Sequence, residues 1–133
     1  MKRPVGLQIR SAPGEVASKI MAHFGKRLRE WMEQRGVGLV DIAQALQISY
    51  TYVAFLGKDK PYGRLLSPEN AVALAEFLRI DPDAVFAAMG QINPFLAEEV
   101  PAEVLEEELI QLHKNLRDRL KEIELEKREA KRK

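Results

Sequence analysis

The side chains best placed for chemistry in this 133-residue chain are three cations in one short segment. Lys58, Lys60 and Arg64 alternate there with Pro61 and Gly63, a composition that is typical of a surface loop. Lys and Arg side chains grouped in this way bind phosphate groups, which supplies affinity and a steep salt dependence but little sequence information. A set of solvated surface charges is the alternative for the same residues.

The segment before this loop is apolar and ends in a second group of candidate binding residues. If Val53 and Leu56 face the core, then Tyr50, Thr51 and Phe55 lie outward. Thr and Phe can contact a thymine methyl group, and Tyr can bond to a phosphate or a base edge. None of them forms the bidentate pair that separates one base from another, so we expect modest sequence discrimination.

Two short helices joined by a tight turn must position these side chains. The turn is predicted at Gln47–Ile48–Ser49, within residues 39–56. Asp41 or a neighbour starts the first helix, Ser49 is a natural N-cap of the second, and Gly57 ends it. This is the layout of a helix-turn-helix, in which the second helix is held out to enter a DNA groove.

Three further helices are predicted around this pair. Apolar residues recur every three or four positions over 15–35, and Gly36 gives a stop. Ser67–Pro68–Glu69 and Asp81–Pro82–Asp83 each combine a cap with a proline and an acid, which is typical of a helix start, and the last helix runs to Gly90. Five helices joined by short loops predict a compact all-α domain over 15–90.

Eight short segments in this domain carry a family resemblance. They are Phe24–Arg29, Arg35–Gly36, Asp41–Leu46, Ile48–Ser49, Tyr52–Val53, Ser67–Glu69, Leu74–Ala75 and Ile80–Asp83. In order and spacing they resemble the Cro/phage-repressor (XRE) type of helix-turn-helix, over about half of the chain. The resemblance implies a five-helix, repressor-like fold and DNA binding, usually as a dimer.

The predicted function is therefore that of a sequence-dependent, DNA-binding transcriptional regulator that acts as a dimer on double-stranded DNA. The predicted DNA-binding residues are Ser49, Tyr50, Thr51, Phe55, Lys58, Lys60 and Arg64. A protein-interaction adaptor on the same fold is the alternative, with the Tyr50–Tyr52–Phe55 surface docking a partner, because exposed aromatic patches also mark protein interfaces.

The two ends of the chain are expected to differ from the central domain. Residues 1–14 are predicted to be a flexible arm, 91–101 a linker, and 102–133 a long helix. An apolar seam runs along this helix with alternating spacings of four and three, through Leu105, Leu109, Leu112 and Leu116. Two leucine heptads predict an oligomerisation element, most simply for a homodimer, and the strict register is lost after the fourth leucine. The alternative is that the leucine face packs back on its own domain.

Composition argues against most other classes. The net charge of the chain is only +1. The chain has no cysteine, and this excludes disulfides and thiolate metal sites. His23 and His113 lie far apart with no nucleophile or ligand pattern around them, so we expect no metal, no cofactor and no enzyme activity. No apolar run approaches the roughly 20 residues that span a bilayer, and a cytoplasmic protein is the expectation.

Overall fold

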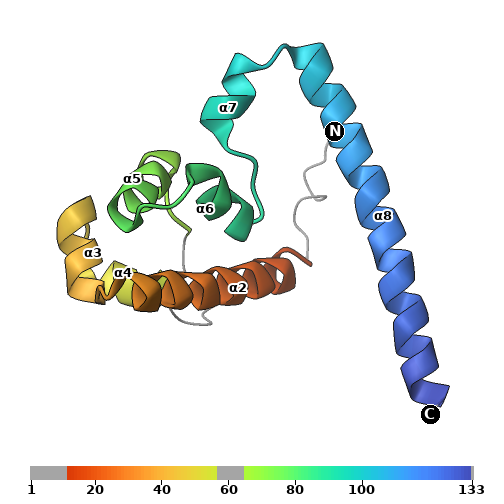
Figure 1. The fold of residues 1–133 in the computed structure, drawn as a ribbon, viewed down its shortest axis with the longest axis horizontal. Helices are drawn as coiled ribbons and strands as arrows, with labels where there is room; N and C mark the ends of the chain where they lie inside the picture. Colours follow the sequence, from red (N-terminus) through yellow and green to blue (C-terminus); the bar gives the residue numbers. More distant parts are fainter. Residues whose placement is uncertain (1–11, 57–64, 133) are drawn as a thin grey trace. The chain divides into compact units, whose positions relative to one another are not determined.

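The computed structural model describes residues 12–56 and 65–132 (Figure 1). These residues form seven helices and no strand: α2 (Ala12–Arg35), α3 (Leu39–Leu46), α4 (Tyr50–Leu56), α5 (Pro68–Leu78), α6 (Pro82–Ala88), α7 (Pro94–Glu99) and α8 (Ala102–Arg132). The predicted all-α class and the long C-terminal helix are confirmed. The chain divides into two compact units, with the boundary after Pro94.

The first helix begins earlier than predicted. It starts at Ala12, so the predicted boundaries at Gly14 and Glu15 are wrong by three residues. Pro13 does not break the helix, because the first-turn N–H groups have no acceptor within a helix in any case. The rest of the predicted arm, residues 1–11, lies outside the described residues. At the other end Gly36 adopts a left-handed φ of +67°, and the predicted stop is confirmed.

The caps of α5 and α6 form as their sequence signals predict. The Ser67 hydroxyl accepts a hydrogen bond from the Asn70 backbone N–H at 3.2 Å. Asp81 does the same for the Asp83 N–H at 2.9 Å, and a proline opens each helix. These bonds satisfy backbone donors that a helix N-terminus leaves unpaired.

One apolar core joins α2 to α6. α3 packs on α4 and α5, α5 packs on α6, and α2 contacts α4, α5 and α6 (Figure 1). The most deeply buried side chains are Phe24, Leu28, Ile42, Val53, Leu74, Leu78, Val85, Phe86 and Met89. Among the described residues no polar or charged side chain is buried. Burial of this apolar surface is the main favourable term in the stability of the bundle.

A long-range bond from one arginine fastens two helix ends within this bundle. Arg35, the last residue of α2, donates from Nε to the Leu78 carbonyl at 2.6 Å and from Nη2 to the Arg79 carbonyl at 3.0 Å. These carbonyls belong to the C-terminal end of α5, where acceptors lack partners within the helix. Arg35 therefore caps a helix 43 residues away in the chain.

The predicted linker at 91–101 is not without structure. It contains α7, in which Pro94 stands at the first position and helix-forming residues follow. The predicted linker thus includes a short helix, and the boundary between the two compact units falls within it.

The last helix, α8, is continuous over 31 residues and starts at Ala102 as predicted. None of its described side chains is buried. Its leucines 112, 116 and 120 are between 43% and 58% exposed.

Within the described ranges, no single helix is long and apolar enough to span a membrane. α3 and α4 reach that apolarity only when taken together, as a pair bent by 119°.

Candidate nucleic-acid interface

The turn between α3 and α4 falls where the sequence places it. Gln47 adopts a left-handed conformation, with φ 57° and ψ 45°. The Ile48 N–H then bonds to the Ala43 carbonyl at 3.1 Å, which closes the turn. The chain direction changes by 119° between the two helices. The three-residue connection thus orients α4 at a steep angle to α3.

The N-termini of both helices are capped by side chains. The Gly38 N–H donates to Asp41 Oδ2 at 2.8 Å, so that this carboxylate sits in the first turn of α3. The Ser49 hydroxyl accepts from the Tyr52 N–H at 3.1 Å, and its predicted N-cap role is confirmed. Because the Ser49 Oγ accepts this hydrogen bond, the main function of Ser49 is to cap the N-terminus of α4.

The inward and outward faces of α4 follow the predicted division with one exception. Val53 and Leu56 are buried, at 0% and 3% exposure. Tyr50 is 53% exposed and Thr51 is also exposed, both at the N-terminal end of the helix. The sequence places Phe55 outward, but in the structure its side chain is partly buried. The free face of α4 is therefore its first turn.

Tyr52 does not belong to that free face. Its ring is half-buried against the core, and its hydroxyl donates to the Leu65 carbonyl at 2.9 Å. A continuous Tyr50–Tyr52–Phe55 docking surface is therefore wrong for this structure, because a helical residue two positions after Tyr50 points to another side. Tyr52 instead holds the start of the segment that leads into α5.

The predicted cationic loop falls outside the described residues. Lys58, Lys60 and Arg64 all lie in 57–64, of which the structure describes nothing. The described residues on either side, Leu56 and Leu65, both pack against the core beside α4.

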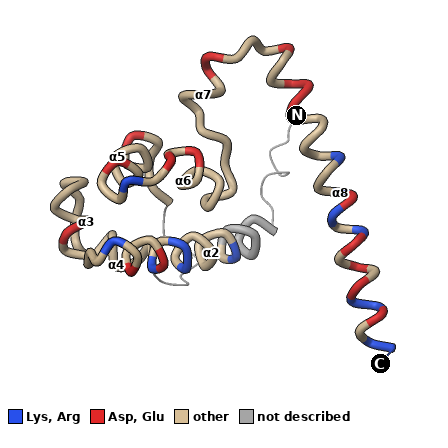
Figure 2. The backbone as a smooth tube through the Cα atoms, viewed as in Figure 1, with Lys and Arg blue, Asp and Glu red and all other residues tan. Residues whose placement is uncertain are grey.

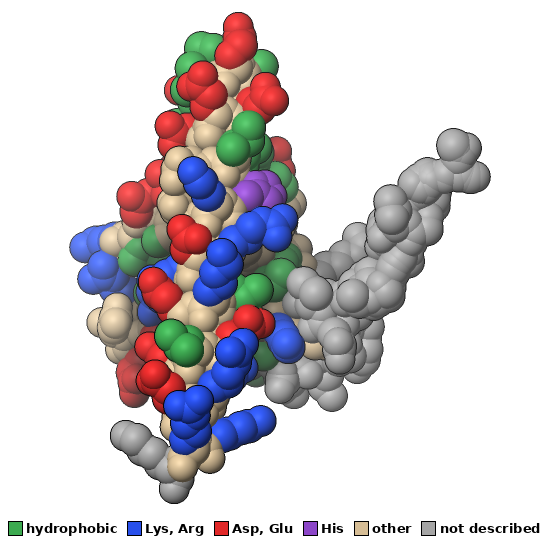
Figure 3. Space-filling model, turned by 90° about the vertical axis from the view of Figure 1, so that its right-hand side faces the viewer, with side chains coloured by type: hydrophobic (Ala, Val, Ile, Leu, Met, Phe, Trp, Pro, Cys, Tyr) green, Lys and Arg blue, Asp and Glu red, His purple; other side chains and the backbone are tan. Residues whose placement is uncertain are grey.

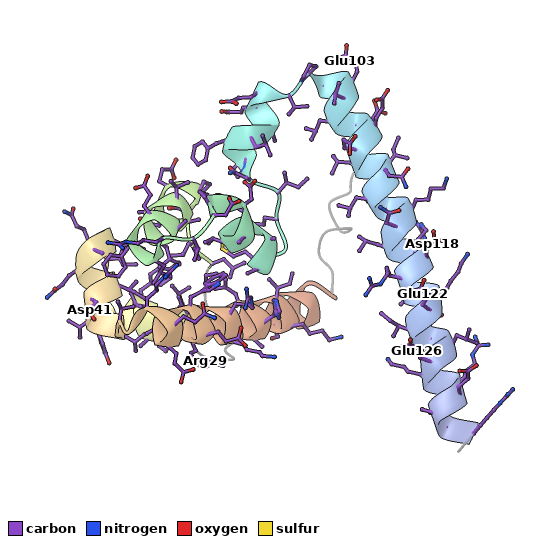
Figure 4. All side chains as sticks on the ribbon, viewed as in Figure 1. Arg29, Asp41, Glu103, Asp118, Glu122 and Glu126 are labelled. Carbon is purple, nitrogen blue, oxygen red and sulfur yellow. The ribbon has the colours of Figure 1, made fainter. Side chains whose placement is uncertain are left out.

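The described part of the helix pair is almost uncharged. Within residues 39–56 the one charged side chain is Asp41, and Figure 2 shows the rest of α3 without Lys, Arg or Glu. The neighbouring α2 carries exposed Lys26 and Arg29. Arg29 projects from α2 on the side away from α5 and α6 (Figure 4). Positive charge in the described bundle is therefore supplied by α2 and by Arg79 after α5, and not by α3 or α4.

Two exposed amides belong to the first helix of the pair and to the turn after it. Gln44 on α3 and Gln47 in the turn are both exposed. They were not among the predicted site residues. The sequence indicates that Gln44 is exposed, because Ile42, Ala43 and Leu46 form the buried face of an amphipathic helix and Gln44 lies outside that face. A Gln side chain can form a bidentate pair with adenine, which Tyr50 and Thr51 cannot.

The described residues show no arrangement suited to a metal. No group of three or more His, Asp or Glu side chains in those ranges lies close enough to hold an ion. His23 on α2 and His113 on α8 are both exposed. His113 Nδ1 lies 2.7 Å from the Leu109 carbonyl of its own helix.

Comparison with known proteins adds no relative: no family model, no curated protein and no solved structure matches this chain.

Proposed function

We propose that the helix bundle binds double-stranded DNA through α3 and α4, as a transcriptional regulator of the Cro/phage-repressor helix-turn-helix type, and that the protein acts as a dimer through α8. The observation that carries the proposal is the 119° bend across residues 47–49, with the first turn of α4 exposed. Helix-turn-helix units join two helices at about 90–120° through a turn of three or four residues.

The exposure pattern supports this reading of the bend. In a helix-turn-helix the N-terminal residues of the second helix contact base edges. Tyr50 and Thr51 are the exposed residues at that end of α4, while Val53 and Leu56 anchor the other side in the core. α4 is thus held by its buried face and offers its N-terminal end to a groove.

The chemistry of that end sets the expected mode of recognition. Tyr50 and Thr51 bring one hydroxyl each and an apolar surface, and the amides of Gln44 and Gln47 lie nearby in the chain. Lys58, Lys60 and Arg64 would add contacts to phosphates. Affinity would then come mostly from charge, and base discrimination from few side chains.

The test is fluorescence anisotropy with the full chain and labelled duplexes of mixed genomic sequence, across a salt series. Binding should weaken steeply as salt rises, because phosphate contacts release counterions. The triple variant Lys58→Ala, Lys60→Ala, Arg64→Ala should weaken binding on every duplex alike and reduce the salt slope by roughly two to three.

A charge-matched control separates local contact from net charge. Lys127→Ala, Lys131→Ala, Arg132→Ala removes the same charge from the end of α8. It should leave affinity within about twofold if the loop after α4 is the phosphate contact. Equal losses in both triple variants, or no binding at low salt, would reject the proposed interface.

An adaptor function remains the second candidate because of two exposed side chains. Val40 and Tyr50 are 54% and 53% exposed, although both helices bury other large apolar residues, namely Ile42, Leu46, Val53 and Leu56. Such residues also mark protein interfaces. Tyr50→Ala with Tyr50→Phe as its control tests this: a DNA-contacting hydroxyl is lost in both variants, whereas a docked ring is lost only in the first.

A further inference from the structure

An apolar stripe runs along α8 for longer than the two leucine heptads suggest. It consists of Leu105, Leu109, Leu112, Leu116, Leu120 and Ile123, and none of these side chains is buried. The spacings are four, three, four, four and three. The extra step of four makes an 11-residue repeat, which follows a nearly straight helix more closely than a heptad does. At about 100° per residue the six side chains fall within roughly 80° of the helix circumference.

The stripe is nearly symmetrical about its middle. Ala102, three residues before Leu105, extends it to seven positions. Three pairs of stripe residues share one midpoint, which lies between Leu112 and His113: Ala102 with Ile123, Leu105 with Leu120, and Leu109 with Leu116. Two copies laid antiparallel about this midpoint therefore align six of the seven stripe residues with another apolar residue, and the two Leu112 residues lie one residue apart at the centre. A two-fold axis through the midpoint makes the contact self-complementary.

The charges beside the stripe are not symmetrical about the midpoint. Glu106, Glu107 and Glu108 precede it, whereas Arg117, Arg119 and Lys121 follow it with Asp118 among them. Figure 3 shows acidic side chains without basic ones at the N-terminal end of α8, and basic and acidic side chains mixed farther along. In a parallel pair each block would face its own copy, and like charges would repel.

Antiparallel packing brings the opposite blocks together. Flanking residues on the same side of the stripe meet in an antiparallel pair. Glu106 would then lie beside Arg117 of the second copy on one side, and Glu108 beside Arg119 of the second copy on the other. Arg119 is 3.9 Å from Glu122 in its own helix, but the two side chains are 75% and 68% exposed, so this pair is weak and can be exchanged.

We propose that α8 binds a second copy of itself in an antiparallel pair centred between Leu112 and His113. The proposal deepens the dimer in the proposed function and does not depend on DNA binding. It places the two Ala102 residues roughly 32 Å apart along the pair, at 1.5 Å per residue. That separation is close to one turn of DNA, roughly 34 Å, which is the spacing of two half-sites.

Cysteine cross-linking of the full chain tests the orientation, since the chain has no cysteine of its own. Ala102→Cys and Ile123→Cys should not form disulfide-linked dimers separately, because equal positions lie far apart. A mixture of the two variants should form them, and Leu112→Cys should form them alone. A linked dimer from Ala102→Cys alone would overturn the proposal in favour of a parallel pair. A monomer mass for the unmodified chain in analytical ultracentrifugation would also overturn it.

Charge reversal tests the register. Glu106→Arg with Glu108→Arg should weaken dimerisation by roughly 10- to 100-fold, and adding Arg117→Glu with Arg119→Glu in the same chain should restore it. Glu103→Arg with Glu107→Arg is the matched control, because these residues lie on the face opposite the stripe, and it should stay within about threefold. Equal weakening by both reversals would overturn the register. All of these measurements omit DNA, so failed pairing and failed DNA binding are separate results.

Discussion

The helix bundle and α8 differ in how far they bury their own apolar side chains. α2 to α6 cover most of theirs, with Phe24, Val53, Leu78 and Phe86 at 0% exposure. In α8 no described side chain is buried, and Leu112, Leu116 and Leu120 of its stripe are exposed. Both regions carry helical periodicity in the sequence, so periodicity alone does not tell which face finds a partner within the chain. The bundle is stabilised by tertiary packing, and α8 by local features.

The local features of α8 are consistent with a helix that forms without a covered face. It is rich in Glu, Lys, Arg and Leu, which have high helix propensity. Glu103 stands in the first turn and Lys131 and Arg132 in the last, where they complement the helix dipole. A surface helix stabilised in this way can keep its apolar stripe free for another chain.

The largest expected effect comes from truncating a buried leucine in the bundle. Leu74→Ala removes a side chain that is 1% exposed and should lower the free energy of unfolding by about 3 kcal/mol, through lost burial and a cavity. Leu116→Ala makes the same change at 58% exposure on α8. It should alter the unfolding of the bundle by less than about 0.5 kcal/mol. Urea titrations would measure both, and equal losses would contradict the contrast between the two regions.

Substitution of Arg35 tests whether side-chain hydrogen bonds contribute to the stability of the bundle in addition to apolar packing. Arg35→Ala removes both bonds to the carbonyls at the end of α5 and should cost about 1 to 2 kcal/mol, at the lower end because the site is partly exposed. Gln34→Ala, at an exposed neighbouring position, is the control and should change stability by less than about 0.5 kcal/mol. Thermal unfolding in low and moderate salt would compare them. An unchanged midpoint for Arg35→Ala would show that solvent replaces the bonds fully.

Ser49 tests the cap that directs α4. Ser49→Ala should lower stability by about 1 kcal/mol, because the Tyr52 N–H loses its acceptor. Ser49→Asp keeps an acceptor and should retain stability while weakening DNA binding, since it adds a negative charge beside the proposed interface. Urea unfolding and anisotropy on the same two variants would separate the roles. If Ser49→Asp and the unmodified chain bound DNA with equal affinity, the DNA would not contact the N-terminus of α4.

A substitution at Gln47 has the smallest expected effect on stability, and it is the one substitution expected to raise stability. Its φ of 57° lies in the region that glycine adopts without penalty, so Gln47→Gly should raise stability by about 0.5 to 1 kcal/mol. Gln44→Gly, within helix α3, should instead lower stability by about 1 kcal/mol. Calorimetry would show opposite shifts in the unfolding temperature. Shifts of the same sign would contradict the left-handed turn.

Much of the bundle was predictable because its signals are local. The caps at Ser49, Ser67 and Asp81 depend on residues two or three positions apart, and the structure contains each of them. The candidate site was less predictable. Tyr52 was grouped with outward aromatic residues, but its hydroxyl bonds to Leu65, 13 residues on. The position of a chain segment that returns from a distance is not encoded in local spacing.

The sequence by itself determined where most of the helices lie, where the turn at 47–49 breaks them, and that α8 carries an apolar stripe, because caps, periodicity and spacing act over a few residues. Only the tertiary structure decided which aromatic side chains of α4 are covered, that Arg35 caps α5, and that α3 and α4 meet at 119°. Those features depend on contacts between segments far apart in the chain, and these form only when the core packs as a whole.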